Sequence, residues 1–209
     1  MIPVTVLAVR YLASAEPGLC RSLGAPEGYP CLGILTTDCD DATYIALDEA
    51  TKAADVKVCY GASFYAGASN ASTPNAGEVI GILAAPTPGA LHSGMEAALS
   101  FLKTIGFESA GDVPYLAHTV SRCGSYLAKI AGVPEGSALS YLIAPPLESM
   151  FAMDSALKSA DVKLCKLFTP PSETNFGGGI LTGSQSACYS ACGAFAQAVA
   201  AVATQPKEG

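Results

Sequence analysis

The strongest polar cluster in the sequence consists of three aspartates within four positions, Asp38, Asp40 and Asp41. They follow an apolar run expected to form a strand, and they precede an expected helix. An aspartate at a helix start accepts backbone N–H bonds and complements the helix dipole, so one interpretation is helix capping alone. Capping needs only one such residue. The other interpretation is a negatively charged site for a metal ion or an organic ammonium, to which Glu78 adds a carboxylate.

Other residues with chemical potential form weaker patterns. The glycine-rich segment 170–179 lacks the lysine and the glycine spacing of a phosphate-binding loop, so a mobile loop is the favoured interpretation. His92 and His118 have no nucleophile in a recognisable motif and are expected to be structural or solvated. Cys188 and Cys192 lie four residues apart without a neighbouring histidine, which disfavours zinc. We therefore assign no catalytic residue and no metal ligand.

An internal repeat indicates how these residues are positioned. The segment 46–59 matches 152–165 at nine of 14 positions with a constant offset of 106 residues. Upstream, Gly24–Gly28 matches Gly132–Gly136 at an offset of 108, each with the pattern Gly-x-Pro-Glu-Gly. A period this long indicates a duplicated domain and not a solenoid. We predict two domains, residues 1–108 and 109–209, with a boundary segment at 104–113.

Both copies show the same order of elements: strand, short helix, strand, helix, two strands and a closing amphipathic helix. The expected strands are 4–9, 31–37, 55–64 and 78–85 in the first copy, and 115–120, 141–145, 161–168 and 179–183 in the second. The middle helices are expected at 43–54 and 149–160. This alternation predicts a compact α/β sandwich for each copy. The first copy has a longer loop, residues 61–77, where a duplicated domain can acquire a new role.

Composition restricts the function classes. The net charge is −7 with only 11 basic residues, which argues against nucleic-acid binding. Half of the residues are hydrophobic, yet we find no uninterrupted apolar run of membrane-spanning length. Burial in subunit contacts is the favoured explanation, although abundant Ala and Gly also raise the count. The first 15 residues make a poor signal peptide, and eight cysteines then indicate a reducing compartment.

The sequence resembles the bacterial microcompartment shell proteins, specifically the tandem-domain type of ethanolamine utilisation. The motifs that carry the resemblance are Asp40–Lys52, Leu116–Leu127, Ala144–Glu148, Ser172–Asn175 and Leu181–Gln185. The resemblance covers most of the chain, from about residue 32 to 195. It implies a non-enzymatic shell protein with two tandem, circularly permuted shell domains. Three chains would form a flat pseudohexamer that tiles edge to edge with other shell proteins around a cytosolic compartment.

The resemblance also implies a central pore gated by loops and a small acidic pocket that binds ethanolamine. The implied ethanolamine-binding residues are Asp40, Asp41, Glu78, Phe107 and Thr174. The implied gating residues are Tyr65, Asn70, Ser72 and Asn75 in the first loop, and Glu173, Asn175, Phe176, Gly177 and Gly178 in the second. No prosthetic group is expected, but the pore or its surface is a plausible route for cobalamin, which the enclosed lyase of such compartments needs.

Two alternatives remain open at the level of sequence. One is a carboxylate-metal hydrolase that uses Asp38, Asp40, Asp41 and Glu78 and needs further ligands at the same place. The other is a shell protein of a different compartment, such as one for propanediol.

Overall fold

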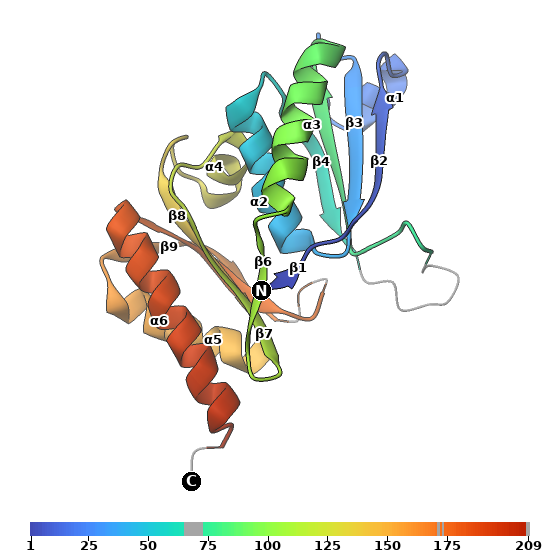
Figure 1. The fold of residues 1–209 in the computed structure, drawn as a ribbon. Helices are drawn as coiled ribbons and strands as arrows, with labels where there is room; N and C mark the ends of the chain where they lie inside the picture. The colour runs from blue at the N-terminus through green and yellow to red at the C-terminus, as the bar shows by residue number, and fades with distance from the viewer. Residues whose placement is uncertain (65–72, 171, 173, 208–209) are drawn as a thin grey trace. The chain divides into compact units, whose positions relative to one another are not determined.

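The computed structural model describes residues 1–64, 73–170, 172 and 174–207, and they form a mixed α/β structure (Figure 1). The chain folds into two compact units. The N-terminal unit holds Pro3–Ile105 together with Gly124–Leu127. The C-terminal unit holds Met1–Ile2, Gly106–Cys123 and Ala128–Gly209. Each unit therefore includes a short segment from the other copy of the sequence repeat: Gly124–Leu127 in the N-terminal unit and Met1–Ile2 in the C-terminal unit.

The N-terminal unit is a four-stranded sheet in the order β2-β3-β5-β4 with two helices on one face. Its elements are β2 (Val6–Leu12), α1 (Pro17–Ser22), β3 (Cys31–Thr37), α2 (Asp40–Ala53), β4 (Lys57–Ser63), β5 (Val79–Ala85) and α3 (Pro88–Leu102). The long helices α2 and α3 pack against each other and the sheet (Figure 1). On the opposite face, a smaller cluster around Leu32, Ile82 and Ala84 packs beneath α1 with Leu23.

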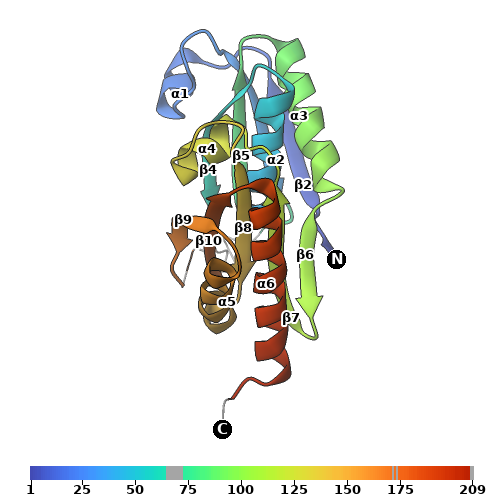
Figure 2. The same ribbon diagram turned by 90° about the vertical axis from the view of Figure 1, so that its left-hand side faces the viewer.

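The C-terminal unit contains a six-stranded sheet in the order β1-β6-β7-β8-β10-β9. Its elements are β1 (Ile2–Pro3), β6 (Gly106–Ala110), β7 (Val113–Val120), α4 (Ser125–Ala131), β8 (Ala138–Ala144), α5 (Pro146–Ser159), β9 (Val162–Phe168), β10 (Gly177–Gly183) and α6 (Gln185–Thr204). Helices α5 and α6 lie side by side on one face of this sheet (Figure 2). The order β7-β8-β10-β9 repeats β2-β3-β5-β4, so the duplication seen in the sequence is a duplication of topology.

Equivalent local signals start the equivalent helices. Thr87 accepts the backbone N–H of Ala90 at 3.2 Å and caps α3, whereas Ser184 accepts that of Ala187 at 3.1 Å and caps α6. The central strands β3 and β8 are apolar and almost wholly buried, as strands covered on both faces should be.

The strands near the sequence boundary differ from our expectation. The segment 104–113 contains β6 and a two-residue turn to β7, because Ala110 pairs with Val113 and Gly111 has a φ of +60°.

Strand β10 begins at Gly177, two residues earlier than predicted. A side chain at Gly178 would collide with the carbonyl oxygen of Leu142 on β8, so the glycines allow close strand pairing here.

Helix α6 is long and apolar enough by composition to cross a membrane. It nevertheless packs in the core of its own unit, where Cys188, Ala191, Phe195 and Val199 are buried against α5 and the sheet. One face of α6 therefore packs in this core, and 33% of its most apolar window is buried within the structure.

Candidate functional site

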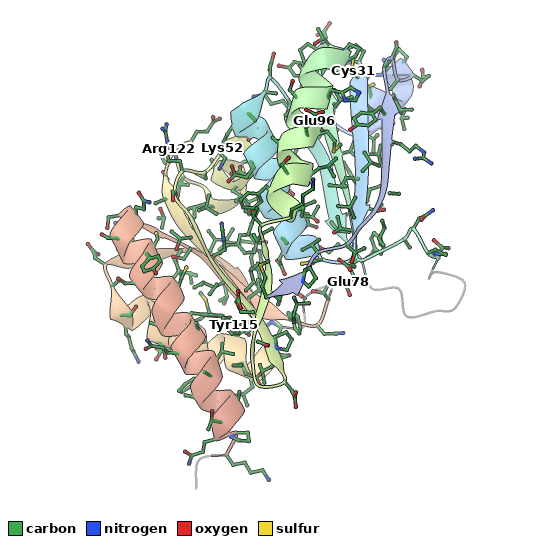
Figure 3. All side chains as sticks on the ribbon, in the orientation of Figure 1. Cys31, Lys52, Glu78, Glu96, Tyr115 and Arg122 are labelled. Carbon is green, nitrogen blue, oxygen red and sulfur yellow. The ribbon has the colours of Figure 1, made fainter. Side chains whose placement is uncertain are left out.

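The acidic cluster lies at one end of the sheet in the N-terminal unit. Strand β3 ends at Thr37, which pairs with Val79 at the start of β5. Asp38 therefore directly follows β3, and Glu78 directly precedes β5 beside it. The backbone N–H of Glu78 donates to the carbonyl oxygen of Thr37 at 2.9 Å. Asp40 begins helix α2 at the same end. Figure 3 labels Glu78 at this edge.

The three aspartates have different surroundings. Asp38 accepts the backbone N–H of Thr5 at 2.7 Å, which connects it to the chain segment before β2. Asp40 and Asp41 are buried in the first turn of α2, and Asp40 accepts the backbone N–H of Asp41 at 2.8 Å. The N-cap residue, Cys39, makes no side-chain capping bond. The aspartates thus complement the helix dipole from inside the first turn and do not serve as N-caps.

The carboxylates act on one another. Partial desolvation raises the pKa of Glu78, and the negative charges of Asp40 and then Asp38 raise it further. Burial raises the pKa of the Cys39 thiol, and the charges of Asp41, Asp40 and Asp38, in that order, raise it further. A positively charged ligand at this position would relieve the repulsion, because an opposite charge favours the ionised carboxylate. The structure therefore brings together Asp38, Asp40 and Glu78 as the sequence suggested.

Phe107 and Thr174, also expected in the ethanolamine site, belong to the C-terminal unit. Phe107 is buried in β6 and lies against Phe176, with ring centroids 5.8 Å apart. The backbone N–H of Thr174 donates to the hydroxyl of Ser172 at 3.3 Å. Asn175 adopts a left-handed conformation with φ of 66° in the same turn.

The structure describes some of the expected gating residues and not others. Tyr65, Asn70, Ser72 and Glu173 lie outside the described residues. The carbonyl oxygen of Asn75 accepts a hydrogen bond from the Thr36 hydroxyl at 2.9 Å. Gly177 and Gly178 are buried in β10 and pair with Ala144 and Ile143 of β8.

Sequence reasoning missed the role of Asp48. This fully buried carboxylate accepts the backbone N–H of Gly124 at 2.7 Å and that of Leu127 at 2.8 Å, so it caps the first turn of α4. Burial raises its pKa, although both backbone donors favour its ionised form. The repeat gave a misleading signal here, because the equivalent Asp154 is exposed and pairs with Lys158 at 2.6 Å.

The histidines and cysteines show no catalytic arrangement. His92 stacks on Tyr11 with a centroid distance of 4.5 Å. His118 lines a groove of about 1200 Å³ between β7 and α6, together with Tyr115, and Figure 3 labels Tyr115. All eight cysteines are free. Within the described part of the chain, no group of three or more His, Cys, Asp or Glu side chains is arranged to hold a metal ion. Cys188 and Cys192 are buried in α6, where burial raises the pKa of both thiols.

The sequence comparison and the structure comparison both find bacterial microcompartment shell proteins. The chain is 55% identical over 210 residues to the bacterial microcompartment shell protein EutL of Clostridium perfringens (strain 13 / Type A), covering 99% of this chain and 97% of the relative. Its structure resembles that of the ethanolamine utilization protein EutL from Leptotrichia buccalis C-1013-b, with a TM-score of 0.96, 56% identity and coverage of 100% and 98%. The trimeric bacterial microcompartment shell protein PduB shares the fold, with a TM-score of 0.77, 21% identity and coverage of 96% and 89%. No protein-family model matches the chain.

Proposed function

The chain belongs to the EutL family of bacterial microcompartment shell proteins, and we propose that three copies form a pseudohexameric tile with a gated central pore and an ethanolamine-binding pocket. Two tandem shell domains make up its fold. Its role is structural and not enzymatic, and it is located in the shell of the cytoplasmic compartment. The identity of 55% to EutL, against 21% to PduB, places it in the ethanolamine-utilisation type. This family membership excludes the carboxylate-metal hydrolase considered above.

The observation that supports a ligand pocket is the acidic cluster of the N-terminal unit. Ethanolamine carries an ammonium group at neutral pH, and buried Asp40 and Asp41 with nearby Glu78 supply the opposite charge. An ammonium has three N–H donors, and carboxylate oxygens are strong acceptors for such groups. The ligand would also offset the mutual repulsion of Asp40 and Glu78. The roles of Phe107 and Thr174 remain predictions from the family resemblance.

The gate of the proposed pore is formed by the loop 61–77 and the turn before β10. In the second of these, Gly177 and Gly178 are already paired with β8, so gate movement at this end would begin before Gly177 or would break strand pairs. We infer that ethanolamine favours the closed pore. A ligand shifts a conformational equilibrium only by its difference in affinity for the two states, so this inference requires the closed state to bind ethanolamine more tightly than the open state. Equal ethanolamine affinity in loop-locked open and closed variants would contradict this inference. Passage or docking of cobalamin at the pore is a further part of the proposal.

The test combines light scattering with calorimetric titration of ethanolamine on one preparation. We expect a mass of three chains and saturable binding that weakens at least tenfold in Asp40→Asn, because loss of one charge-assisted hydrogen bond costs about 1.5 kcal/mol. Asp154→Asn is the matched control, since Asp154 is an exposed carboxylate on α5 of the C-terminal unit. A monomer contradicts the tile, and binding unchanged by Asp40→Asn contradicts the pocket.

A further inference from the structure

In the N-terminal unit, side chains fill the seam between strand β2 and helix α3. Tyr11 of β2 stacks on His92 of α3, with ring centroids 4.5 Å apart and ring planes inclined by 12°. Burial raises the pKa of the Tyr11 phenol, and the negative charge of Glu96 raises it further, so this carboxylate lies near the phenol. Figure 3 labels Glu96 on α3. Two rings and a carboxylate therefore close this first seam.

The equivalent seam of the C-terminal unit, between β7 and α6, has a smaller residue on its strand side. Strands β3 and β8 align at an offset of 107 residues, so Gly33 corresponds to Ser140. Tyr11 pairs with Gly33 on β3, and Thr119 pairs with Ser140 on β8. Thr119 of β7 therefore occupies the position of Tyr11. Its hydroxyl donates to the sulfur of Cys192 at 3.3 Å, which directs the short side chain toward α6.

The helix side of the second seam keeps its ring and loses its carboxylate. The side-chain caps of α3 and α6 align the two helices at an offset of 97 residues. Tyr189 then corresponds to His92, and Gly193 corresponds to Glu96. Tyr189 is 74% exposed, and a Cβ added at Gly193 would meet no atom within 4 Å. The second seam is therefore open, with one aromatic ring at its rim and helix backbone beside it.

The open second seam is the groove of about 1200 Å³ between β7 and α6. Thr119, Tyr189 and Gly193 all line it, and these are the positions whose equivalents fill the first seam. The described residues that line the groove all belong to the C-terminal unit, so the groove lies within one unit. Small-molecule sites have volumes of about 300–1,000 Å³, so the groove has room for an aromatic ring with a substituent.

The lining of the groove also selects by charge. Glu108 and Tyr115 both line it, and Figure 3 labels Tyr115 on β7. Burial raises the pKa of Tyr115, and the negative charge of Glu108 raises it further, so this carboxylate acts within the groove. The terminal ammonium of Met1 pairs with Glu108 at 3.4 Å, but both groups are partly exposed, so the pair is weak. Lysine and arginine are absent from the described lining residues, which disfavours an anionic ligand.

We propose that the groove between β7 and α6 binds a planar aromatic molecule, uncharged or cationic, that stacks on the Tyr189 ring. The bound ring takes the place that Tyr11 has against His92 in the first repeat, and it covers Thr119 and Gly193. Stacked aromatic rings prefer an offset geometry, which orients the ligand in addition to burying it. None of the described lining residues belongs to the acidic cluster or to the proposed gate, so this site is additional to the proposed function.

The test titrates the full chain with 4-fluorophenol, which supplies the ring of a tyrosine side chain, and follows the fluorine signal by NMR. We expect saturable binding by the wild type at pH 8, where a histidine is mostly neutral. Tyr189→Ala should weaken binding about fivefold through loss of the stacked ring. Gly193→Phe should abolish it, because the new side chain fills the groove from a position with open space around its Cβ. Tyr60→Ala removes another exposed tyrosine, on β4, and is the matched control with unchanged affinity.

A second experiment tests the equivalence of the two seams. Adding Tyr11→Ala to Tyr189→Ala should restore binding of 4-fluorophenol, because the first seam is then open and His92 is exposed for stacking. Tyr11→Ala alone should bind more 4-fluorophenol per chain than the wild type does. A double variant that binds no better than Tyr189→Ala would overturn the equivalence from which the site is inferred.

Competition measures the charge preference of the groove. Tyramine and 4-hydroxyphenylacetate carry the same phenol with an ammonium and a carboxylate, respectively. Tyramine should displace 4-fluorophenol at the lower concentration, and Glu108→Gln should reduce the difference between the two. Displacement by the anion at the lower concentration would overturn the charge preference.

Two results would overturn the site itself. One is the absence of saturable binding of 4-fluorophenol by the wild type, and the other is binding that is unchanged in both Tyr189→Ala and Gly193→Phe. Solution mass tests the proposed trimer separately, so failure of this site and failure of the proposed function are distinguishable.

Discussion

Asp48 and Asp154 show how one residue type, inherited by duplication, acquires two energetic roles. Asp48 is buried and accepts two backbone N–H groups, whereas Asp154 is exposed and pairs only with a lysine one turn away. Buried donors without acceptors are costly, while an exposed ion pair contributes little. The same substitution at the two positions should therefore have unequal effects.

We expect Asp48→Ala to lower the free energy of unfolding by about 2–6 kcal/mol, because two buried backbone donors lose their acceptor at a cost of about 1–3 kcal/mol each. Urea denaturation followed by circular dichroism at one protein concentration measures this change. Asp154→Ala is the matched control and should shift the value by no more than about 0.5 kcal/mol. Equal effects at both positions would show that the capping bonds of Asp48 contribute nothing specific.

Glu78 provides a test of the acidic cluster by pH. Its folded pKa is raised, so its ionised form costs stability in the folded state. That cost is absent below the unfolded pKa and fully present above the folded pKa, so this group lowers stability as pH rises through the interval between the two. Asp40→Asn removes the larger of the two negative charges that raise the pKa, and the pKa of Glu78 should fall toward its ordinary value.

Carbon-detected NMR titration of protein with labelled glutamate follows the Glu78 carboxyl directly. Asp38→Asn is the comparison variant, and it should lower the pKa of Glu78 by less than Asp40→Asn does, since Asp38 is the smaller contributor. A Glu78 titration that is identical in all three proteins would mean that the carboxylates do not interact, and it would weaken the case for a shared cation pocket.

At the scale of elements, the sequence predicted the order of helices and strands because apolar periodicity and the internal repeat both specify it. Strand β3 was predicted with the observed bounds, Cys31–Thr37. Strand β6 was missed because Gly106 and Gly111 resemble linker residues, although one allows close approach to the Ile2 carbonyl and the other forms a turn. Glycines required by a close contact and glycines in a free linker look the same in a sequence.

The acidic cluster was predictable because its signal is local. Asp38, Asp40 and Asp41 lie within four positions of the sequence, and the antiparallel pairing of β3 with β5 brings Glu78 beside them. The capping of α4 by Asp48 was not predictable, because the donors Gly124 and Leu127 lie 76 and 79 residues away along the chain. Contacts at this separation depend on the packing of whole elements and leave no local pattern.

Two glycines inside equivalent helices should respond oppositely to the same change. Gly193 in α6 has no atom within 4 Å of an added Cβ, so Gly193→Ala should stabilise the protein by about 0.5–1 kcal/mol through helix propensity. At Gly94 in α3 the added Cβ would lie 2.8 Å from a methyl of buried Val56, so Gly94→Ala should destabilise by about 1–3 kcal/mol. Urea denaturation of both variants measures the two signs, and equal signs would contradict the packing at Gly94.

At the scale of the whole molecule, the two units exchange short segments of chain. Gly124–Leu127 is part of the N-terminal unit, although the residues on both sides of it belong to the C-terminal unit. In the reverse direction, Met1–Ile2 joins the C-terminal unit, where the terminal ammonium pairs with Glu108 at 3.4 Å. Helix α4 is divided between the units, because its first turn belongs to the N-terminal unit and its remainder to the C-terminal unit. Unfolding of the N-terminal unit would therefore remove the Asp48 carboxylate that caps this helix.

This exchange predicts a single cooperative unfolding transition for the full chain. Units joined by a simple linker unfold separately when their stabilities differ, whereas a shared helix couples them. Gly94→Ala tests this, because the destabilised site lies wholly in the N-terminal unit. Tyrosine fluorescence and circular dichroism should move together to a lower urea midpoint. A second transition that retains the wild-type midpoint would show that the C-terminal unit remains folded alone, and that the shared first turn of α4 couples the units too weakly to unite their folding.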